Sequence, residues 1–96
     1  MEQMEITREL RSFLDAEGRL KALPAKQRKR MLALGYLYDR LEAERTYTES
    51  EINGLLNGWT CFRDPATVRR ELYNHHFLNR TTDGTSYWKE PTPPTL

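Results

Sequence analysis

The sequence predicts a mainly α-helical domain with a small β hairpin, arranged as a winged helix-turn-helix with an additional N-terminal helix and short strand. Two observations predict this fold. From Tyr47 onward the chain runs in the order short strand, helix, loop, helix and hairpin, as that fold requires. The second of these helices has an N-cap residue, Asp64, a proline at its first position, and the adjacent arginines Arg69 and Arg70.

Residues 5–23 are expected to form the additional helix and strand. Apolar residues recur at helical spacing over 5–14, which predicts a short amphipathic helix; they are Ile6, Leu10, Phe13 and Leu14. A turn is expected over 15–18. Basic and apolar residues then alternate over 19–23, a pattern typical of a short edge strand.

The longest helix is expected over 24–42, because Pro24 is tolerated at a first helical position. Its apolar residues fall within one third of the helical wheel, so this helix should form the centre of the core. These residues are Met31, Leu34, Leu37, Tyr38 and Leu41. A minimal strand is expected next, over 45–47.

The helix that follows has clear boundary signals. Thr48 and Glu51 form a capping-box pattern, in which each side chain satisfies an amide at the start of the helix. Gly58 is expected to end the helix. Its buried face is expected to consist of Ile52, Leu55 and Leu56.

The last helix, expected over 65–76, leads into the hairpin. Strands are expected over 77–82 and 85–89, joined by Asp83-Gly84, a dipeptide suited to a tight turn. The helix residues expected to face the core are Val68, Leu72 and His75.

Length and composition predict one domain, residues 1–89, followed by a flexible proline-rich tail, residues 90–96. No apolar run approaches the roughly 18 residues that a membrane span needs, and no signal-peptide pattern follows Met1, so no membrane partner is expected. The single cysteine, Cys61, fits a reducing, cytoplasmic setting. A net charge of +1 argues against strong unspecific binding to nucleic acid, so the distribution of charge matters more than its sum.

The solvent-facing side of the helix over 65–76 is the strongest functional signal. Arginine can bind guanine through two hydrogen bonds, asparagine can bind adenine in the same way, and threonine can contact a thymine methyl or a phosphate. The candidate DNA-binding residues on this side are Thr67, Arg69, Arg70, Tyr73 and Asn74. The alternative is that the arginines simply pair with Glu71 or Asp64.

A second basic group lies at the start of the long helix and consists of Lys26, Arg28, Lys29 and Arg30. Cations are unfavourable there by about 0.3–1 kcal/mol each, so a nearby anion is expected. DNA phosphates are one candidate; acidic residues such as Asp15 and Glu17, or acids of a partner protein, are the other. Arg80 is a further candidate DNA contact at the root of the hairpin, whereas the hairpin tip carries the acid Asp83 and no base.

Enzymatic activity is not expected, because the sequence contains no pattern of nucleophile, base and orienting group and no phosphate-binding loop. His75 and His76 are adjacent, so on a helix their side chains point about 100° apart. With Cys61 as the only further soft ligand, no zinc-binding spacing is present. No metal and no cofactor are expected.

Five blocks of the sequence resemble the domain-of-unknown-function family 2087 and occur in order between about Phe13 and Lys89. They are Gly18-Arg19-Leu20-Lys21, Leu23-Pro24-Ala25-Lys26, Tyr47-Thr48-Glu49-Ser50-Glu51-Ile52-Asn53, Asp64 with Ala66-Thr67-Val68-Arg69-Arg70-Glu71-Leu72, and Tyr87-Trp88. Members of this family occur as small bacterial proteins and as C-terminal domains behind ArsR-type helix-turn-helix regulators. The resemblance therefore implies a role associated with transcription.

We therefore expect a cytoplasmic DNA-binding or transcription-regulation domain whose partner is double-stranded DNA. The alternative is a protein–protein interaction or dimerisation module, in which the same scaffold binds another transcription regulator or a second copy of itself without contacting DNA. One continuous basic surface would favour DNA. A basic run far in space from the helix over 65–76 would favour the alternative.

Overall fold

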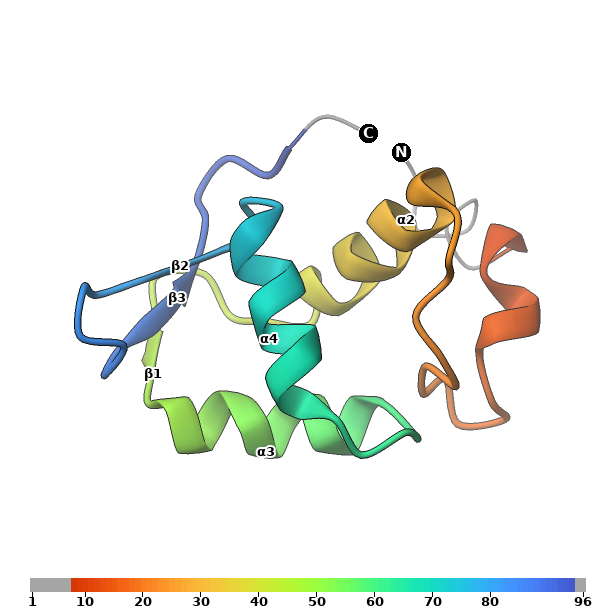
Figure 1. Ribbon diagram of the computed structural model, residues 1–96, viewed down its shortest axis with the longest axis horizontal. Coiled ribbons are helices and arrows are strands. Elements are labelled where there is room, and N and C mark those ends of the chain that lie inside the picture. The colour runs from red at the N-terminus through yellow and green to blue at the C-terminus, as the bar shows by residue number, and fades with distance from the viewer. Residues whose placement is uncertain (1–7, 95–96) are drawn as a thin grey trace.

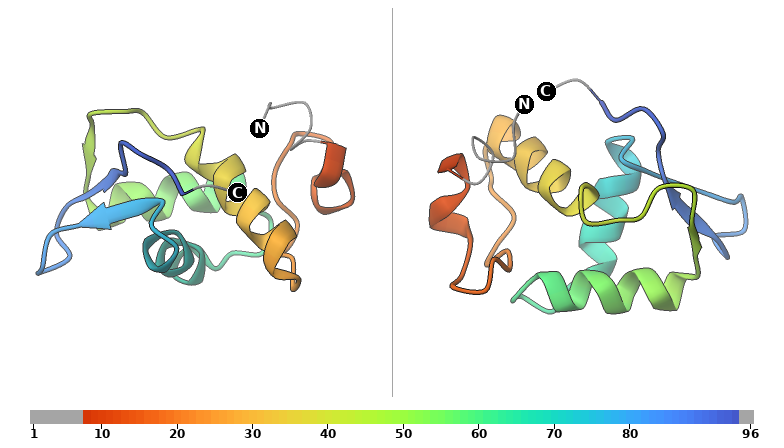
Figure 2. Two further views of the ribbon diagram at one scale, coloured as in Figure 1. Left: turned by 90° about the horizontal axis from the view of Figure 1, so that it is seen from above. Right: turned by 180° about the vertical axis from the view of Figure 1, so that it is seen from behind.

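A computed structural model describes residues 8–94 of the chain (Figure 1). The helices and strands whose bounds lie within this range are a 3-10 helix, three α-helices and three short strands. In order they are η1 (Arg11–Phe13), α2 (Gln27–Tyr38), β1 (Thr46–Tyr47), α3 (Glu49–Trp59), α4 (Pro65–Asn74), β2 (Leu78–Arg80) and β3 (Tyr87–Lys89). The sheet lies at one end of the helices and the η1 segment at the other (Figures 1 and 2).

The three strands form an antiparallel sheet in the order β1-β3-β2, so the last strand lies in the middle. Tyr87 is paired with Tyr47 on one side and with Arg80 on the other. The expected strand after the long helix and the expected hairpin are therefore both present, although the strands are shorter than the sequence pattern indicates. The central position of β3 connects the hairpin to the start of α3.

The core lies where α2, α3 and α4 meet. Val68 and Leu72 of α4 are completely buried, as are Ile52 and Leu56 of α3. This confirms the rotation that apolar periodicity predicts for α4. On α2 every residue of the segment 32–38 is buried, so this half of the helix is enclosed on all sides rather than along one stripe.

The helix starts follow the sequence signals closely. The backbone amide of Glu51 donates to the Thr48 hydroxyl at 3.1 Å, and the Glu51 carboxylate accepts from the Thr48 amide at 2.8 Å. This is the reciprocal capping box that the sequence predicts. At α4, Asp64 accepts from the amide of Thr67 at 3.2 Å, and Pro65 occupies the first helical position.

The expectation that the long helix covers 24–42 is wrong at both ends. Lys26 is extended and precedes the first turn of α2. The carbonyl of Pro24 instead accepts a bond from the Arg30 side chain at 3.0 Å. After Tyr38 the chain tightens into turns, in which the amide of Leu41 bonds to the Tyr38 carbonyl at 3.0 Å. Leu41 is therefore buried outside the helix that was expected to contain it.

Two further boundaries differ from expectation. Gly58 does not end α3, which continues to Trp59; Thr60 ends it, and its hydroxyl donates to the Leu56 carbonyl at 2.8 Å. The strand expected over 19–23 is reduced to bridges at Leu20, which pairs with Leu14 and Thr60. The backbone amide and carbonyl of the buried Leu20 are thus hydrogen-bonded to Trp59 and Cys61 without a longer strand.

The predicted ends of the domain can be compared with the structure only within residues 8–94. Of the helix expected over 5–14, residues 5–7 lie outside the described residues; Arg8 and Glu9 are helical and η1 follows. After β3, the amide of Glu90 bonds to the Phe77 carbonyl at 2.9 Å, and the Glu90 carbonyl accepts from the Tyr38 hydroxyl at 2.5 Å. The chain is thus attached to the core one residue beyond the predicted boundary, and the flexible tail stays a prediction.

The hairpin turns at the expected place but not by the expected two-residue turn. The amide of Gly84 bonds to the Thr81 carbonyl at 3.0 Å, and the Thr81 amide bonds to the Ser86 carbonyl at 3.0 Å. Gly84 has a φ of +73°, whereas Asp83 does not have a positive φ. A tight turn on Asp83-Gly84 would need positive φ at both residues, so the tip is a longer loop built around one left-handed glycine.

Replacing Gly84 with Ala should destabilise the protein by about 1–2 kcal/mol, because a side chain resists the left-handed backbone at this position. Gly54 is the matched control, since it lies within α3 and an added Cβ there would contact nothing within 4 Å. Gly54→Ala should stabilise by about 0.5–1 kcal/mol through helix propensity. Urea unfolding of both variants measures the difference, and shifts of the same sign would contradict this description of the hairpin.

Candidate functional site

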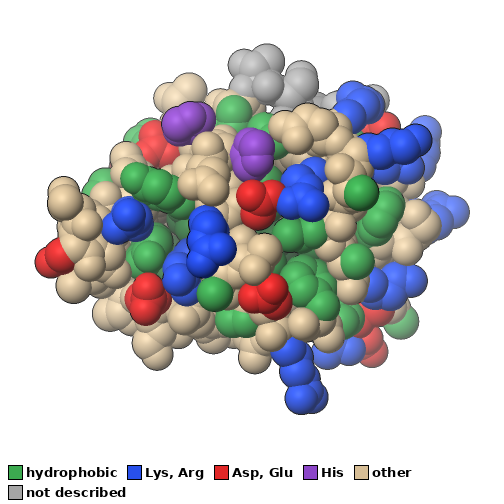
Figure 3. Space-filling model, in the orientation of Figure 1, with side chains coloured by type: hydrophobic (Ala, Val, Ile, Leu, Met, Phe, Trp, Pro, Cys, Tyr) green, Lys and Arg blue, Asp and Glu red, His purple; other side chains and the backbone are tan. Residues whose placement is uncertain are grey.

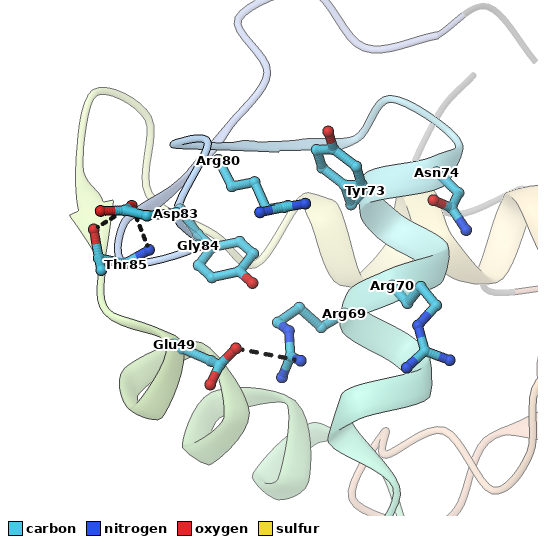
Figure 4. A pocket seen from close by; sticks show the side chains of 10 residues that line it. Glu49, Arg69, Arg70, Tyr73, Asn74, Arg80, Asp83, Gly84 and Thr85 are labelled. Atoms are coloured by element: carbon cyan, nitrogen blue, oxygen red, sulfur yellow. Dashed lines mark hydrogen bonds and ion pairs between the residues drawn. The ribbon is translucent and has the colours of Figure 1, made fainter.

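An open groove of about 700 Å³ lies between α4, the start of α3 and the hairpin (Figure 4). Five of the predicted DNA-binding residues line it: Arg69, Arg70, Tyr73 and Asn74 from α4, and Arg80 from the hairpin. The remaining lining residues are Glu49, Asp83, Gly84, Thr85 and Tyr87. The structure thus brings the predicted helix face and the root of the hairpin together in one concave surface.

One side of α4 is packed into the core, and this leaves the other side facing the groove. With Val68 and Leu72 buried, Arg70 and Asn74 are exposed, and Tyr73 is 36% exposed, the only large exposed apolar side chain among residues 8–94. No described residue forms a hydrogen bond or ion pair with the Arg70 side chain. Arg70 is therefore available to a ligand.

Arg69, in contrast, joins α4 to α3. Its side chain, only 17% exposed, donates to the amide oxygen of Asn53 and lies 3.4 Å from a carboxylate oxygen of Glu49. The guanidinium also lies 5.8 Å from the centre of the Tyr87 ring. Neither Glu71 nor Asp64, the partners considered from sequence, pairs with it. Most of its donors face protein, so its first role is structural.

Arg80 forms the opposite wall of the groove. Its guanidinium lies over the Tyr73 ring, 4.8 Å from the ring centre, and Nη1 donates to the carbonyls of Thr81 and Thr82 at 3.3 Å each. Stacking and two hydrogen bonds hold the planar guanidinium in place. The sequence located Arg80 at the root of the hairpin but gave no sign of its contact with Tyr73.

Asp83, the acid at the hairpin tip, is bound to the tip itself. Its Oδ1 accepts from the Thr81 hydroxyl at 2.7 Å, the Thr85 hydroxyl at 2.8 Å and the Thr85 amide at 3.1 Å. The hydrogen bonds from Thr81 and then Thr85 lower the pKa of Asp83 below the ordinary value of 3.8. Figure 4 shows Asp83 turned toward Thr85. The carboxylate is thus engaged with the tip rather than with Arg80.

Two of the four residues in the basic run at the start of α2 are compensated by acids of the protein. Arg28 Nη2 lies 2.9 Å from both carboxylate oxygens of Glu9, and Arg30 pairs with Glu71 of α4. These acids are not the two named from sequence, because Asp15 and Glu17 pair with Arg19 at 2.8 and 3.4 Å. The other members of the run are Lys26, which is exposed, and Lys29, whose ammonium lies 5.8 Å from the Phe13 ring centre.

The basic surface is therefore neither continuous nor remote from α4. On the face shown in Figure 3, Lys and Arg side chains gather over α4 and the hairpin and again over the start of α2, with acidic side chains between the groups. The Arg30–Glu71 ion pair joins the two regions. Thr67 lies outside the groove; its side chain is half-buried and its amide serves the cap at Asp64.

The histidines lie beyond the last turn of α4. His75 was expected to face the core, but it caps the helix and is only half-buried, because α4 ends at Asn74. His76 is exposed with a φ of +66°. Among residues 8–94, no three His, Cys, Asp or Glu side chains are grouped as metal ligands would be. In the same part of the chain, no helix has the length and apolar character needed to cross a membrane.

The fold and the groove define a small domain with a three-stranded antiparallel sheet, in which a helix and a hairpin enclose an arginine-lined surface. The chain belongs to the DUF2087 family, described as an uncharacterized protein conserved in bacteria, whose model matches residues 19–89. That range contains every element from α2 to β3 and all residues of the groove. No curated protein and no solved structure is significantly similar to the chain.

Adjacent arginines should differ in their effect on stability. Arg69→Ala leaves the Asn53 oxygen without its donor, which should lower the free energy of unfolding by about 1–3 kcal/mol. Arg70→Ala removes an exposed side chain and should change it by less than about 0.5 kcal/mol. Chemical denaturation of the two variants tests this difference. Equal losses would show that Arg69 does not hold α4 against α3.

The hairpin tip should respond to acid through Asp83. Because the folded-state pKa of Asp83 is lowered, its contribution to stability is present above the unfolded-state pKa and is lost as the pH falls through the folded-state pKa. Thr81→Val removes the strongest of its hydrogen bonds and should raise the Asp83 pKa, measured by carboxyl NMR titration. Thr82→Val is the control, because the Thr82 side chain does not bond to Asp83. An unchanged pKa in Thr81→Val would contradict the assigned network.

Proposed function

We propose that this protein is a cytoplasmic bacterial winged helix-turn-helix domain that binds double-stranded DNA and acts in transcription regulation. The order α2-β1-α3-α4-β2-β3 supports this, with α3 and α4 as the helix-turn-helix and β2-β3 as the wing. Strand β2 of the hairpin packs against α4. In helix-turn-helix proteins the second helix enters the major groove, so α4 is the recognition helix in this proposal.

The observation that carries the proposal is the exposed pair Arg70 and Asn74 on α4. They lie four residues apart, on the same side of the helix, and face away from the buried Val68 and Leu72. Arginine and asparagine are the side chains that bind guanine and adenine, respectively, through two hydrogen bonds in the major groove. Arg69 is not assigned this role, because its side chain is mostly buried, donates to Asn53 and pairs with Glu49.

Phosphate contacts in this arrangement are few. Arg80 lies at the root of the wing, and Lys26 and Lys29 lie at the start of α2, which the Arg30–Glu71 ion pair holds beside α4. Arg28 and Arg30 are already paired with Glu9 and Glu71, so their contacts with DNA phosphates would release few counterions from the DNA. We therefore expect modest affinity and a shallow dependence on salt.

The second candidate function is a protein–protein interaction or dimerisation module, with another transcription regulator or a second copy of the chain as partner. The acidic side chains between the two basic groups favour it, as does the acid at the wing tip. Mixed charge of this kind suits a protein surface better than the uniformly negative backbone of DNA.

Binding to duplex DNA should depend on Arg70. Arg70→Ala should weaken binding to a selected duplex by about 1–3 kcal/mol and relax base preference at one position, because a bidentate contact is lost. Fluorescence anisotropy against selected and scrambled duplexes at two salt concentrations measures both effects. Arg11→Ala is the control: it removes the same charge from η1, at the end of the molecule opposite the hairpin (Figure 1).

The opposite result would be decisive. If the wild-type protein does not bind a randomised duplex pool at low salt, where electrostatic attraction is strongest, direct DNA binding is wrong. The interaction-module proposal would then stand, and sedimentation equilibrium would distinguish a homodimer from a module that needs another protein.

A further inference from the structure

Three guanidinium groups meet in the groove between α4 and the hairpin. Arg69 and Arg70 come from α4 and Arg80 from the hairpin, and all three line the same concave surface (Figure 4). Like charges gathered in a groove repel one another, and a bound anion relieves this repulsion.

The acids of the groove compensate these charges only in part. Glu49 pairs with Arg69, at 3.4 Å. Asp83 directs its hydrogen bonds to Thr81 and Thr85 and forms no ion pair with a described residue. The charges of Arg70 and Arg80 therefore have no counter-ion among residues 8–94.

The two uncompensated arginines differ in how firmly they are held. Arg80 is held by the Tyr73 ring and by two backbone carbonyls, all of which leave its Nε and Nη2 hydrogens available. Arg70 is free to move toward a ligand. One fixed guanidinium on the hairpin and one adaptable guanidinium on α4 can bind a tetrahedral oxyanion from two sides.

We propose that this groove is a phosphate-binding site, in which Arg80 and Arg70 donate to the phosphate oxygens and the exposed Tyr73 ring contacts the group that carries the phosphate. The charge favours phosphate over carboxylate: a phosphate monoester carries about −1.5 to −2 at neutral pH and so matches two guanidinium groups. The planar donors of arginine also fit two phosphate oxygens at once.

The phosphate can come from two sources, a free phosphorylated small molecule or the backbone of DNA. The charge match favours the first, because a backbone phosphodiester carries a single negative charge. The site does not depend on DNA binding, because its donors and its charge are present whether or not α4 enters a duplex. Failure of the duplex experiment would therefore leave this proposal intact, and failure of this proposal would leave base contacts by Arg70 and Asn74 untouched.

The test is an NMR titration of the ¹⁵N-labelled full chain with inorganic phosphate, a nucleoside monophosphate, the unphosphorylated nucleoside, and acetate. Phosphate and the nucleotide should shift the backbone amides of Asn74 and Gly84, which line the groove, and leave that of Gly58 unchanged. The nucleoside should cause no such shifts, and acetate should bind more weakly. Shifts no larger with phosphate than with acetate would overturn the proposal.

Variants separate the groove from general electrostatics. Arg70→Gln should raise the nucleotide dissociation constant by about tenfold, the equivalent of one hydrogen bond to a charged group. Arg11→Gln, with the same loss of charge, should leave it unchanged. Arg80→Lys keeps the charge but loses the planar donor, and should also weaken binding. Equal weakening by Arg11→Gln and Arg70→Gln would show that no specific site exists.

Competition identifies the source of the phosphate. If a short duplex displaces the nucleotide and itself shifts the Gly84 amide, which base contacts by Arg70 alone would not do, the site accepts the DNA backbone. If the nucleotide remains bound in the presence of duplex, the site takes a free phosphorylated molecule. Both results require that the groove binds phosphate, and the absence of any nucleotide shift would overturn it for both sources.

Discussion

The burial of Val68 and Leu72 is the constraint on which the rest of the structure depends. Both side chains are completely buried where α4 packs on α3 and α2, so α4 cannot rotate without exposing them to water. That rotation decides which side chains face solvent. It directs Arg69 toward α3 and leaves Arg70 and Asn74 exposed. The polar side chains that α4 contributes to the groove therefore lie on one side of the helix.

Contacts between arginine and tyrosine connect the helix to the hairpin. Arg80 of the hairpin stacks on Tyr73 of α4, and Arg69 of α4 lies beside Tyr87 of β3. Tyr87 is itself almost completely buried in the middle strand of the sheet. The two walls of the groove are thus attached to each other and to the core, so a ligand would meet Arg80 and Tyr73 already in position, whereas Arg70 adjusts to it.

Signals within a few residues predicted the structure well. The capping box at Thr48, the cap at Asp64 and the periodicity of Val68 and Leu72 each depend on neighbouring residues, and each is confirmed. The long helix was predicted too long, because the buried Leu41 continues the apolar pattern after the backbone has left the helix.

The candidate site shows the limit of the same reasoning. Helical periodicity and residue type predict the helix face, but the hydrogen bond between Arg69 and Asn53 spans 16 residues and the Arg30–Glu71 pair spans 41. Such partners depend on how the helices pack, and no local pattern in one sequence reveals them. The sequence therefore indicates which basic residues could bind DNA, but not which of them are already paired with other residues of the protein.

Hydrogen–deuterium exchange with and without a randomised duplex pool at low salt tests the central claim most directly. The account predicts that duplex DNA slows amide exchange in α4 and in the hairpin, residues 65–74 and 78–89. The reason is that DNA covers the side of α4 opposite the buried Val68 and Leu72. Slower exchange confined to η1 and α2, or no change anywhere, would contradict it.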